Sequence, residues 1–182
     1  RKTLDPTYKA NRKKTRKPMA FFRAIEWVKE TYHFIELEGL EADDVLGLES
    51  QNFEAICSSD KDLRTIPGRL YNPMKKTWED VTPLEADRWF YSQVLMGDTA
   101  DGYKGCPGIG AVKAERLLAP CNSRPAMEAV VREAYAKAGL DDDAALLQAR
   151  LARILRPGEY WKQKGPLLFS WMEVPSSDIE DK

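Results

Sequence analysis

The sequence predicts an α/β fold whose first part holds a sheet with flanking helices and whose second part is helical. Three short stretches, at residues 33–37, 53–58 and 69–73, are typical of strands. From residue 83 onward, the apolar residues recur at helical spacing, and proline or glycine separates the segments. We expect an α/β core over residues 1–82, a helical region over residues 83–174 and a flexible tail over residues 175–182.

Composition excludes several classes of protein. The 182 residues are 43% hydrophobic and 31% charged, as in globular proteins that dissolve in water. No apolar run approaches the roughly 20 residues of a membrane-spanning helix, and no secretory signal opens the chain, so we expect no membrane partner. The scattered Cys57, Cys106 and Cys121 predict neither a zinc ribbon nor a disulfide framework, and we expect a cytoplasmic protein. His33 is the only histidine, which argues against a histidine-centred nucleophile.

Charge is divided unevenly along the chain. Residues 1–23 hold nine lysines and arginines against the single acid Asp5, a net charge of +8, while the remainder carries −9 and the whole chain −1. A basic segment beside an acidic body predicts that one part grips a polyanion and the other holds metal ions. Because the chain begins at Arg1, inside this basic segment, we expect it to be truncated at its front.

The basic segment begins as an arm and continues as a helix. Residues 3–14 have no apolar stripe, which is typical of a solvated tail or of a mobile basic arm. Tyr8 favours the arm, since an aromatic ring among cations can stack on an unpaired nucleotide and hold its phosphates. Pro18 suits a first helical position, and apolar residues then recur at helical spacing to about Thr31.

Acidic residues follow the first predicted strand. Gly39 ends the stretch at residues 33–37, and Glu41, Asp43 and Asp44 then begin a predicted helix, where the helix dipole favours negative charge. Taken alone, these acids are more typical of an ordinary helix start than of a metal site.

Asp60 and Asp62 follow the second predicted strand at its carboxyl end. A spacing of two sends both side chains to the same side of an extended backbone. Ligands of open α/β sheets bind outside the carboxyl ends of strands, so these acids are expected to face a ligand. A capping aspartate and a surface aspartate are the alternative. The third stretch, residues 69–73, is expected to be an edge strand that ends at Pro73.

The helical region begins with a capping box at residues 82–85, which starts a helix expected to end near residue 96. Asp98 and Asp101 come directly after it, and their spacing of three places both on one side of a helical turn.

A glycine turn follows these acids. In Gly108-Ile109-Gly110, glycines let the backbone approach a phosphate, and the next helix offers unpaired N–H groups together with Lys113 and Arg116. Such a turn also occurs where helices merely pack, but its place directly after Asp101 favours phosphate binding.

Two more helices are expected before the tail. One begins at Pro125 and ends near Gly139, and the other is capped by Asp141 and buries residues as far as Leu155. The aromatic and apolar residues after it are expected to pack back on the body, namely Trp161, Leu167, Leu168, Phe169 and Trp171.

Seven carboxylates form the main functional pattern. Like charges brought together cost stability unless a cation neutralises them, and hard divalent cations prefer oxygen ligands. The sequence therefore predicts a two-metal phosphodiesterase site formed by Glu41, Asp43, Asp44, Asp60, Asp62, Asp98 and Asp101.

The motifs agree in order, spacing and strand context with one known family over roughly residues 2–160. They are Asp5-Pro6-x-Tyr8-Lys9-Ala10-Asn11-Arg12-Lys13, Glu41-Ala42-Asp43-Asp44, Ser58-Ser59-Asp60-Lys61-Asp62, Gly97-Asp98-x-x-Asp101-Gly102-Tyr103 and Gly108-Ile109-Gly110. This set resembles the 5′-nuclease (flap endonuclease) superfamily, and within it the 5′→3′ exonucleases of T-odd bacteriophages.

The resemblance implies a mostly parallel central sheet with helices on both faces, a helical arch formed by residues 1–31, and a helix–three-turn–helix that holds duplex DNA. It implies two Mg²⁺ ions, with Mn²⁺ as an alternative, bound by the seven carboxylates, and a K⁺ ion at the helix–three-turn–helix as in some relatives. Catalytic roles would fall to Lys9, Arg12, Asp60 and Asp62. DNA contacts would come from Tyr8, Lys9, Arg12, Lys13, Lys14, Arg16, Gly108, Ile109, Gly110 and Lys113.

The implied activity is sequence-independent hydrolysis of DNA from 5′ ends, with flaps and RNA–DNA hybrids as further substrates, in phage replication or recombination. One departure stands at the front, because the family has two more strands before the Tyr8 motif, each ending in an aspartate. The chain is therefore expected to be a fragment, or to be completed by a separate N-terminal piece. The alternatives are a non-catalytic module that binds branched DNA and, less favoured, a calcium-binding or metallophosphatase domain, for which EF-hand spacing is lacking.

Overall fold

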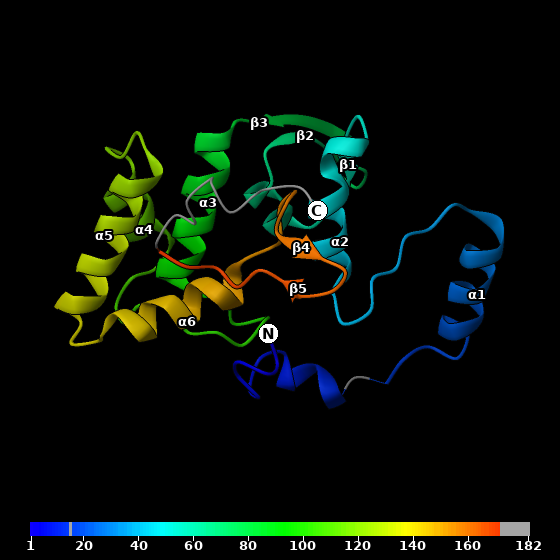
Figure 1. The fold of residues 1–182 in the computed structure, drawn as a ribbon, viewed down its shortest axis with the longest axis horizontal. Helices are drawn as coiled ribbons and strands as arrows, with labels where there is room; N and C mark the ends of the chain where they lie inside the picture. The colour runs from blue at the N-terminus through cyan, green and yellow to red at the C-terminus, as the bar shows by residue number, and fades with distance from the viewer. Residues whose placement is uncertain (15, 172–182) are drawn as a thin grey trace.

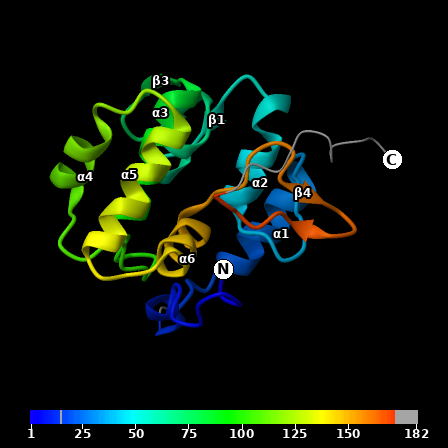
Figure 2. The same cartoon turned by 60° about the vertical axis from the view of Figure 1, so that its left-hand side comes forward.

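The computed structural model describes residues 1–14 and 16–171, and for Lys13 and Lys14 it describes the backbone only. The predicted tail at residues 175–182 lies outside this part. The helices of the second half lie together on one side with the sheet next to them, and an N-terminal helix stands on the opposite side in Figure 1 (Figures 1 and 2). An α/β fold with a helical second half is therefore confirmed.

The sheet has three strands in the order β1-β2-β3. Strand β1 (Ile56–Cys57) runs parallel to β2 (Gly68–Asn72), and β2 runs antiparallel to β3 (Thr77–Val81). The sheet is thus mixed and small, whereas a mostly parallel sheet was expected. The prediction of an edge strand at residues 69–73 is wrong, because β2 pairs on both sides.

Strand β3 escaped the sequence analysis for a physical reason. Its first four residues are exposed and only Val81 is buried, so no alternation of apolar and polar residues marks it. The turn before it is held by the Asn72 side chain, whose Oδ1 accepts hydrogen bonds from the backbone N–H groups of Met74 and Lys75.

The strand expected at residues 33–37 is absent from the structure, which describes this segment as irregular. Phe34 and Ile35 lie exposed there and meet no neighbouring strand. The stretch at residues 53–58 is likewise reduced to the two residues of β1, and Phe53 is exposed. Apolar composition alone thus predicted one strand that does not form and one that is longer than the strand observed.

Helix α2 (Ala42–Glu49) begins at the predicted acidic stretch and continues into the short η2 (Ser50–Asn52). Helix α2 packs unusually close to the backbone at Leu155. A Cβ placed on Gly47 would lie 2.1 Å from the backbone oxygen of Leu155. Only glycine allows this approach, which brings the acidic start of α2 beside the rest of the body.

The helical region contains α3 (Pro83–Met96), α4 (Ala111–Leu118), α5 (Arg124–Lys137) and α6 (Asp142–Ala152). The predicted capping box is present, with Thr82 and Glu85 bonding each other reciprocally. The largest buried cluster lies among these helices, and the Tyr135 hydroxyl donates to the Val94 carbonyl over 2.7 Å at its centre. Helix α6 ends earlier than expected, since Ile154 and Leu155 are buried in an extended segment beyond it.

The N-terminal segment holds a short 3₁₀ turn, η1 (Ala10–Lys14), and helix α1 (Phe21–Thr31). The helix is confirmed, but within the described part of the chain its apolar stripe is not buried, since α1 contains no buried residue. Figure 1 shows α1 standing apart from the body.

The chain after α6 forms a small hairpin that the sequence did not reveal, β4 (Tyr160–Trp161) with β5 (Gly165–Pro166). Phe169 and Trp171 pack back on Phe90 and Tyr91 as predicted, whereas Trp161, like Leu167 and Leu168, remains exposed. Within the described residues, no helix combines the length and the apolar character needed to cross a bilayer.

Candidate active site

Five of the seven predicted carboxylates line one hollow of about 510 Å³. Its walls come from the start of α2, the segment after β1, the turn after α3, the start of α4 and the basic arm. The acidic residues that line it are Asp43, Asp60, Asp62, Asp98 and Asp101. Residues separated by up to 58 positions in the sequence therefore converge on one solvent-accessible space.

The Asp60 and Asp62 pair is fixed by a local turn. Asp60 caps the 3₁₀ helix η3 (Lys61–Thr65), and its Oδ1 accepts the backbone N–H of Asp62 over 2.9 Å. Hydrogen bonding of the Thr65 hydroxyl to the Asp62 carbonyl, over 2.9 Å, tightens the same turn. The backbone is turned here rather than extended, yet both carboxyl groups line the hollow.

The Asp98 and Asp101 pair lies in a tight turn rather than in a helix. Oδ1 of Asp98 accepts the N–H groups of Ala100 and Asp101, and its backbone pairs with Tyr103. Gly97 makes the turn possible: its φ is +70°, and a Cβ there would lie 2.4 Å from the Lys104 backbone. The turn therefore depends on glycine at the end of α3.

The basic arm closes one side of the hollow. The Lys9 ammonium pairs with Glu41 at 2.7 Å and with Asp101 at 3.5 Å, and the Arg12 guanidinium pairs with Asp101 at 2.5 Å. Tyr8 is buried, and its hydroxyl donates to Asp101 over 3.1 Å and approaches Glu41 at 3.4 Å. The ring is thus packed in the core here, whereas the stacking role predicted for it requires an exposed face.

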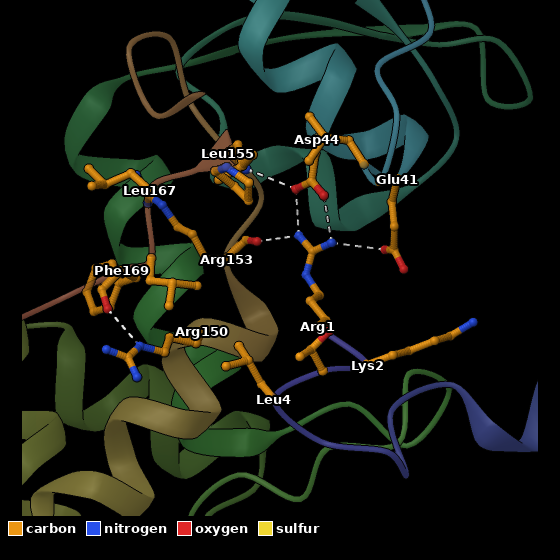
Figure 3. A pocket seen from close by; sticks show the side chains of 15 residues that line it. Arg1, Lys2, Leu4, Glu41, Asp44, Arg150, Arg153, Leu155, Leu167 and Phe169 are labelled. Carbon is orange, nitrogen blue, oxygen red and sulfur yellow. Dashed lines mark hydrogen bonds and ion pairs between the residues drawn. The ribbon is translucent and has the colours of Figure 1, made fainter. Parts of the chain in front are cut away.

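Asp44 departs from the prediction, because its carboxylate does not line the hollow. The group is buried and accepts hydrogen bonds from the Leu155 backbone N–H and from the Arg1 guanidinium (Figure 3). Arg1 also pairs with Glu41 at 3.0 Å and donates to the Arg153 carbonyl. Asp44 thereby joins α2 to the segment after α6, while Glu41 lies between this contact and Lys9.

The glycine turn reaches the hollow only at its end. Gly110 and Ala111, at the start of α4, line the hollow, while Ile109 is buried in the core and Gly108 is exposed. The Lys113 ammonium, on the exposed side of α4, donates to the Gly108 carbonyl over 3.3 Å. Arg16 is exposed, and the side chains of Lys13 and Lys14 are outside the described part of the structure.

Crowding of carboxylates perturbs their acidity. Burial, and then the charge of Asp60, raises the pKa of Asp62 to about 6 and also raises the pKa of Asp43. For Glu41, burial opposes the effect of its partners, but the hydrogen bond from Lys9 and the charge of Arg1 hold the pKa below its usual value. In Glu41, cationic partners outweigh the effect of burial on the pKa, whereas in Asp43 and Asp62 they do not.

The donor chemistry of the hollow suits hard divalent cations, which bind carboxylate oxygens. In the described residues, however, no three acidic, histidine or cysteine side chains are gathered closely enough to form a ready-made cage. The basic groups explain this spacing, since Lys9, Arg12 and Lys61 each pair with a carboxylate of the hollow or its rim. Metal binding by Asp98 or Asp101 would require these ion pairs to open.

Two residues at the site were missed from sequence. Arg1 neutralises Asp44 and Glu41, and no local pattern identifies the partner of a terminal arginine. Gln93 is buried in α3 and donates to Asp62 over 2.7 Å. Its signal was available, because Gln93 occupies a core position at helical spacing from Ala86 and Phe90.

Comparison with known proteins gives a consistent set of relatives, although no family model matches. The exodeoxyribonuclease of Enterobacteria phage T3 is 32% identical over 86% of this chain and 64% of its own length. The exonuclease of Escherichia phage T7 is 30% identical over 86% of this chain and 65% of its own length. The chain thus spans slightly under two thirds of these relatives.

Solved structures share the fold. A bacteriophage T5 protein co-crystallised with metal ions superposes with a TM-score of 0.63 at 17% identity, over 83% of this chain and 70% of that one. The T5 flap endonuclease in a product complex with DNA and metal ions gives 0.60 at 17% identity, over 83% and 68%.

Proposed function

We propose that this chain is a member of the 5′-nuclease family, like the phage exonucleases to which it is similar, and that it is a metal-dependent 5′→3′ exonuclease acting on DNA. The observation that carries the proposal is the convergence of five aspartates on one hollow bordered by cations and a helix start. A phosphodiester and a pair of hard cations need this combination of ligands: oxygen donors for the metal, and cations and N–H groups for the phosphates.

Asp43, Asp60, Asp62, Asp98 and Asp101 would hold the metal, with Glu41 at the rim. When bound, a pair of Mg²⁺ or Mn²⁺ ions activates a water molecule and stabilises charge on the attacking and leaving oxygens. The two T5 proteins were crystallised with metal ions. At 17% sequence identity, they share the fold of this chain. The choice of Mg²⁺ is part of the proposal.

Lys9 and Arg12 would exchange partners during the reaction. Both now neutralise Asp101, and a phosphate entering the hollow would offer them oxygen acceptors of the same charge. Released from Asp101, the two cations would turn to the scissile phosphate and stabilise the charge that develops on it. In this scheme Tyr8 orients Asp101 through its hydroxyl, and stacking of its ring on a base would require the ring to leave the core.

The start of α4 would hold the phosphates of the intact strand. Gly110 and Ala111 line the hollow, and the first N–H groups of a helix favour an anion. Lys113 and a K⁺ ion would add to the same contact. Lys13, Lys14 and Arg16 extend the positive segment, and an affinity that depends on phosphates is independent of sequence and falls steeply with added salt.

The substrates proposed are 5′ ends in duplex or branched DNA, with flaps and RNA–DNA hybrids included, and the products are 5′-phosphorylated nucleotides. Phage relatives support a role in phage replication or recombination inside the cytoplasm of the host cell. A separate N-terminal piece that completes the sheet remains part of the proposal, since β1 is an edge strand.

The proposal is tested with Asp60→Ala and a matched control, Asp80→Ala. Asp60 lines the hollow, whereas Asp80 is an exposed carboxylate on β3. We expect Asp60→Ala to reduce Mg²⁺-dependent release of nucleotides from 5′-labelled duplex DNA by more than the roughly 100-fold typical of an outer-sphere loss. DNA binding should persist in both variants, and Asp80→Ala should cleave like the wild type.

Equal cleavage by the wild type and Asp60→Ala would refute the catalytic role of the hollow. A wild type that binds DNA but never cleaves it would instead support a binding module.

A further inference from the structure

Gln93 is a polar side chain in a place where stability favours an apolar one. It lies in α3, between the buried Phe90 and Val94, and is itself 1% exposed. Burying an amide costs free energy unless its donors and acceptors are all bonded. In Gln93 the Oε1 atom is buried without a hydrogen-bond partner among the described residues.

The one side-chain hydrogen bond recorded for Gln93 is directed at the acidic hollow. Its Nε2 donates to Oδ1 of Asp62 over 2.7 Å, which is short for a neutral donor and typical of a charged acceptor. Gln93 also lines a small cavity of about 20 Å³ together with Glu41, Asp43, Asp62 and Asp101. The amide therefore faces the point where the acids of α2, η3 and the Asp98 turn meet.

Within the described residues, Gln93 is the only recorded hydrogen-bond donor to the Asp62 carboxylate. The other contacts of Asp62 use its backbone, through Asp60 and Thr65, and these fix the turn but leave the side chain free to rotate. A donor on one oxygen restricts that rotation and leaves the second oxygen for another partner. Carboxylates that bind metals are oriented by outer hydrogen bonds of this kind.

From these contacts we infer that Gln93 is a positioning residue that holds the Asp62 carboxylate in its metal-binding orientation. The inference rests on the proposed function, because it presupposes that Asp62 is a metal ligand. A positioning role and a structural role predict different results. The unpaired Oε1 makes Gln93 a poor stabiliser of the core, so removing the amide should leave folding intact and impair metal binding.

The test measures Mn²⁺ affinity by titration calorimetry on the metal-free chain, beside its melting temperature. Gln93→Met keeps the side-chain length and removes the donor, and Gln93→Leu is a second apolar variant. Tyr91→Phe is the matched control, since it removes one buried polar group from the same helix, a hydroxyl 3.4 Å from Arg124. None of these measurements requires DNA cleavage.

We expect the Mn²⁺ dissociation constant to rise about 10- to 100-fold in Gln93→Met and Gln93→Leu. Their melting temperatures should stay within about 3 °C of the wild type or exceed it, which corresponds to roughly 1 kcal/mol for a chain of this size. Tyr91→Phe should bind Mn²⁺ like the wild type.

Folded Gln93 variants with wild-type Mn²⁺ affinity would overturn the inference while leaving the proposed function intact. A cooperative unfolding transition that is lost in both variants would also overturn it, since Gln93 would then be structural. A wild type without Mn²⁺ affinity would contradict the proposed function itself, and the inference with it.

Discussion

At the scale of single residues, the site is defined by which cation neutralises which carboxylate. Lys9 and Arg12 are bound to Asp101, and Arg1 is bound to Asp44 and Glu41. Asp44 and Asp43 are neighbours in sequence, yet one is buried against Leu155 and the other lines the hollow. A charge motif read from sequence identifies the acidic residues but not the direction in which a helix start points each one.

Lys9→Ala tests whether a cation of the basic arm contributes to the rate of cleavage rather than to the affinity for DNA. Lys9 lies next to Asp101 and Glu41, with its side chain 12% exposed, so it is placed for contact with a phosphate inside the hollow rather than with distant DNA. We expect the single-turnover rate at saturating DNA to fall about 100- to 1,000-fold, with DNA affinity changed by less than about tenfold.

The control for this experiment is Lys2→Ala, which removes an exposed lysine of the same basic segment. Loss of affinity in Lys9→Ala at an unchanged saturating rate would show that Lys9 only attracts DNA.

At the scale of elements, the helices with cores were predictable, whereas among the strands of the sheet only β2 lies close to its predicted bounds. Helices α3, α5 and α6 begin at proline or at Asp and Ser caps and bury regular stripes, so sequence placed them within a few residues. The two-residue β1 and the exposed β3 carry no periodic signal. Strand formation depended on pairing partners distant in sequence, which a local pattern does not contain.

Helix α1 is the element whose pattern and packing disagree most. Its apolar residues recur at helical spacing, yet none is buried, and Figure 1 shows the helix apart from the body. The helix lies in the segment for which the family resemblance implies a helical arch, and the arch stays a prediction.

A pair of phenylalanine variants separates these two kinds of helix. Phe22 in α1 is 66% exposed, whereas Phe90 in α3 is 1% exposed. Phe22→Ala should change the free energy of unfolding by less than about 0.5 kcal/mol, as for an ordinary surface substitution. Phe90→Ala should lower it by about 3–5 kcal/mol, because it leaves a cavity in the core.

Chemical denaturation of the two variants measures both values. A large loss of stability in Phe22→Ala would show that α1 packs against the body in solution, contrary to its exposed position here.

At the scale of the whole molecule, the distribution of charge anticipated the architecture. Lys9 and Arg12, from the basic first 23 residues, pair with Asp101 at the hollow where acids from α2, η3 and the turn after α3 converge, so the two halves of the charge asymmetry meet there. Sequence identified the five aspartates that converge, since their motifs lie where elements begin or end. It did not reveal that Lys9 and Arg12 would pair with Asp101, or Arg1 with Asp44 and Glu41, because ion pairs between distant segments depend on the final fold.

The central claim is that the hollow binds divalent metal, and anomalous diffraction from crystals of the chain grown with Mn²⁺ tests it most directly. We expect strong anomalous peaks within the hollow, in contact with carboxylate oxygens of Asp60, Asp62, Asp98 or Asp101, with Lys9 and Arg12 displaced from their present partners. Well-ordered crystals in which Mn²⁺ avoids the hollow, while Lys9 and Arg12 still pair with Asp101, would contradict it.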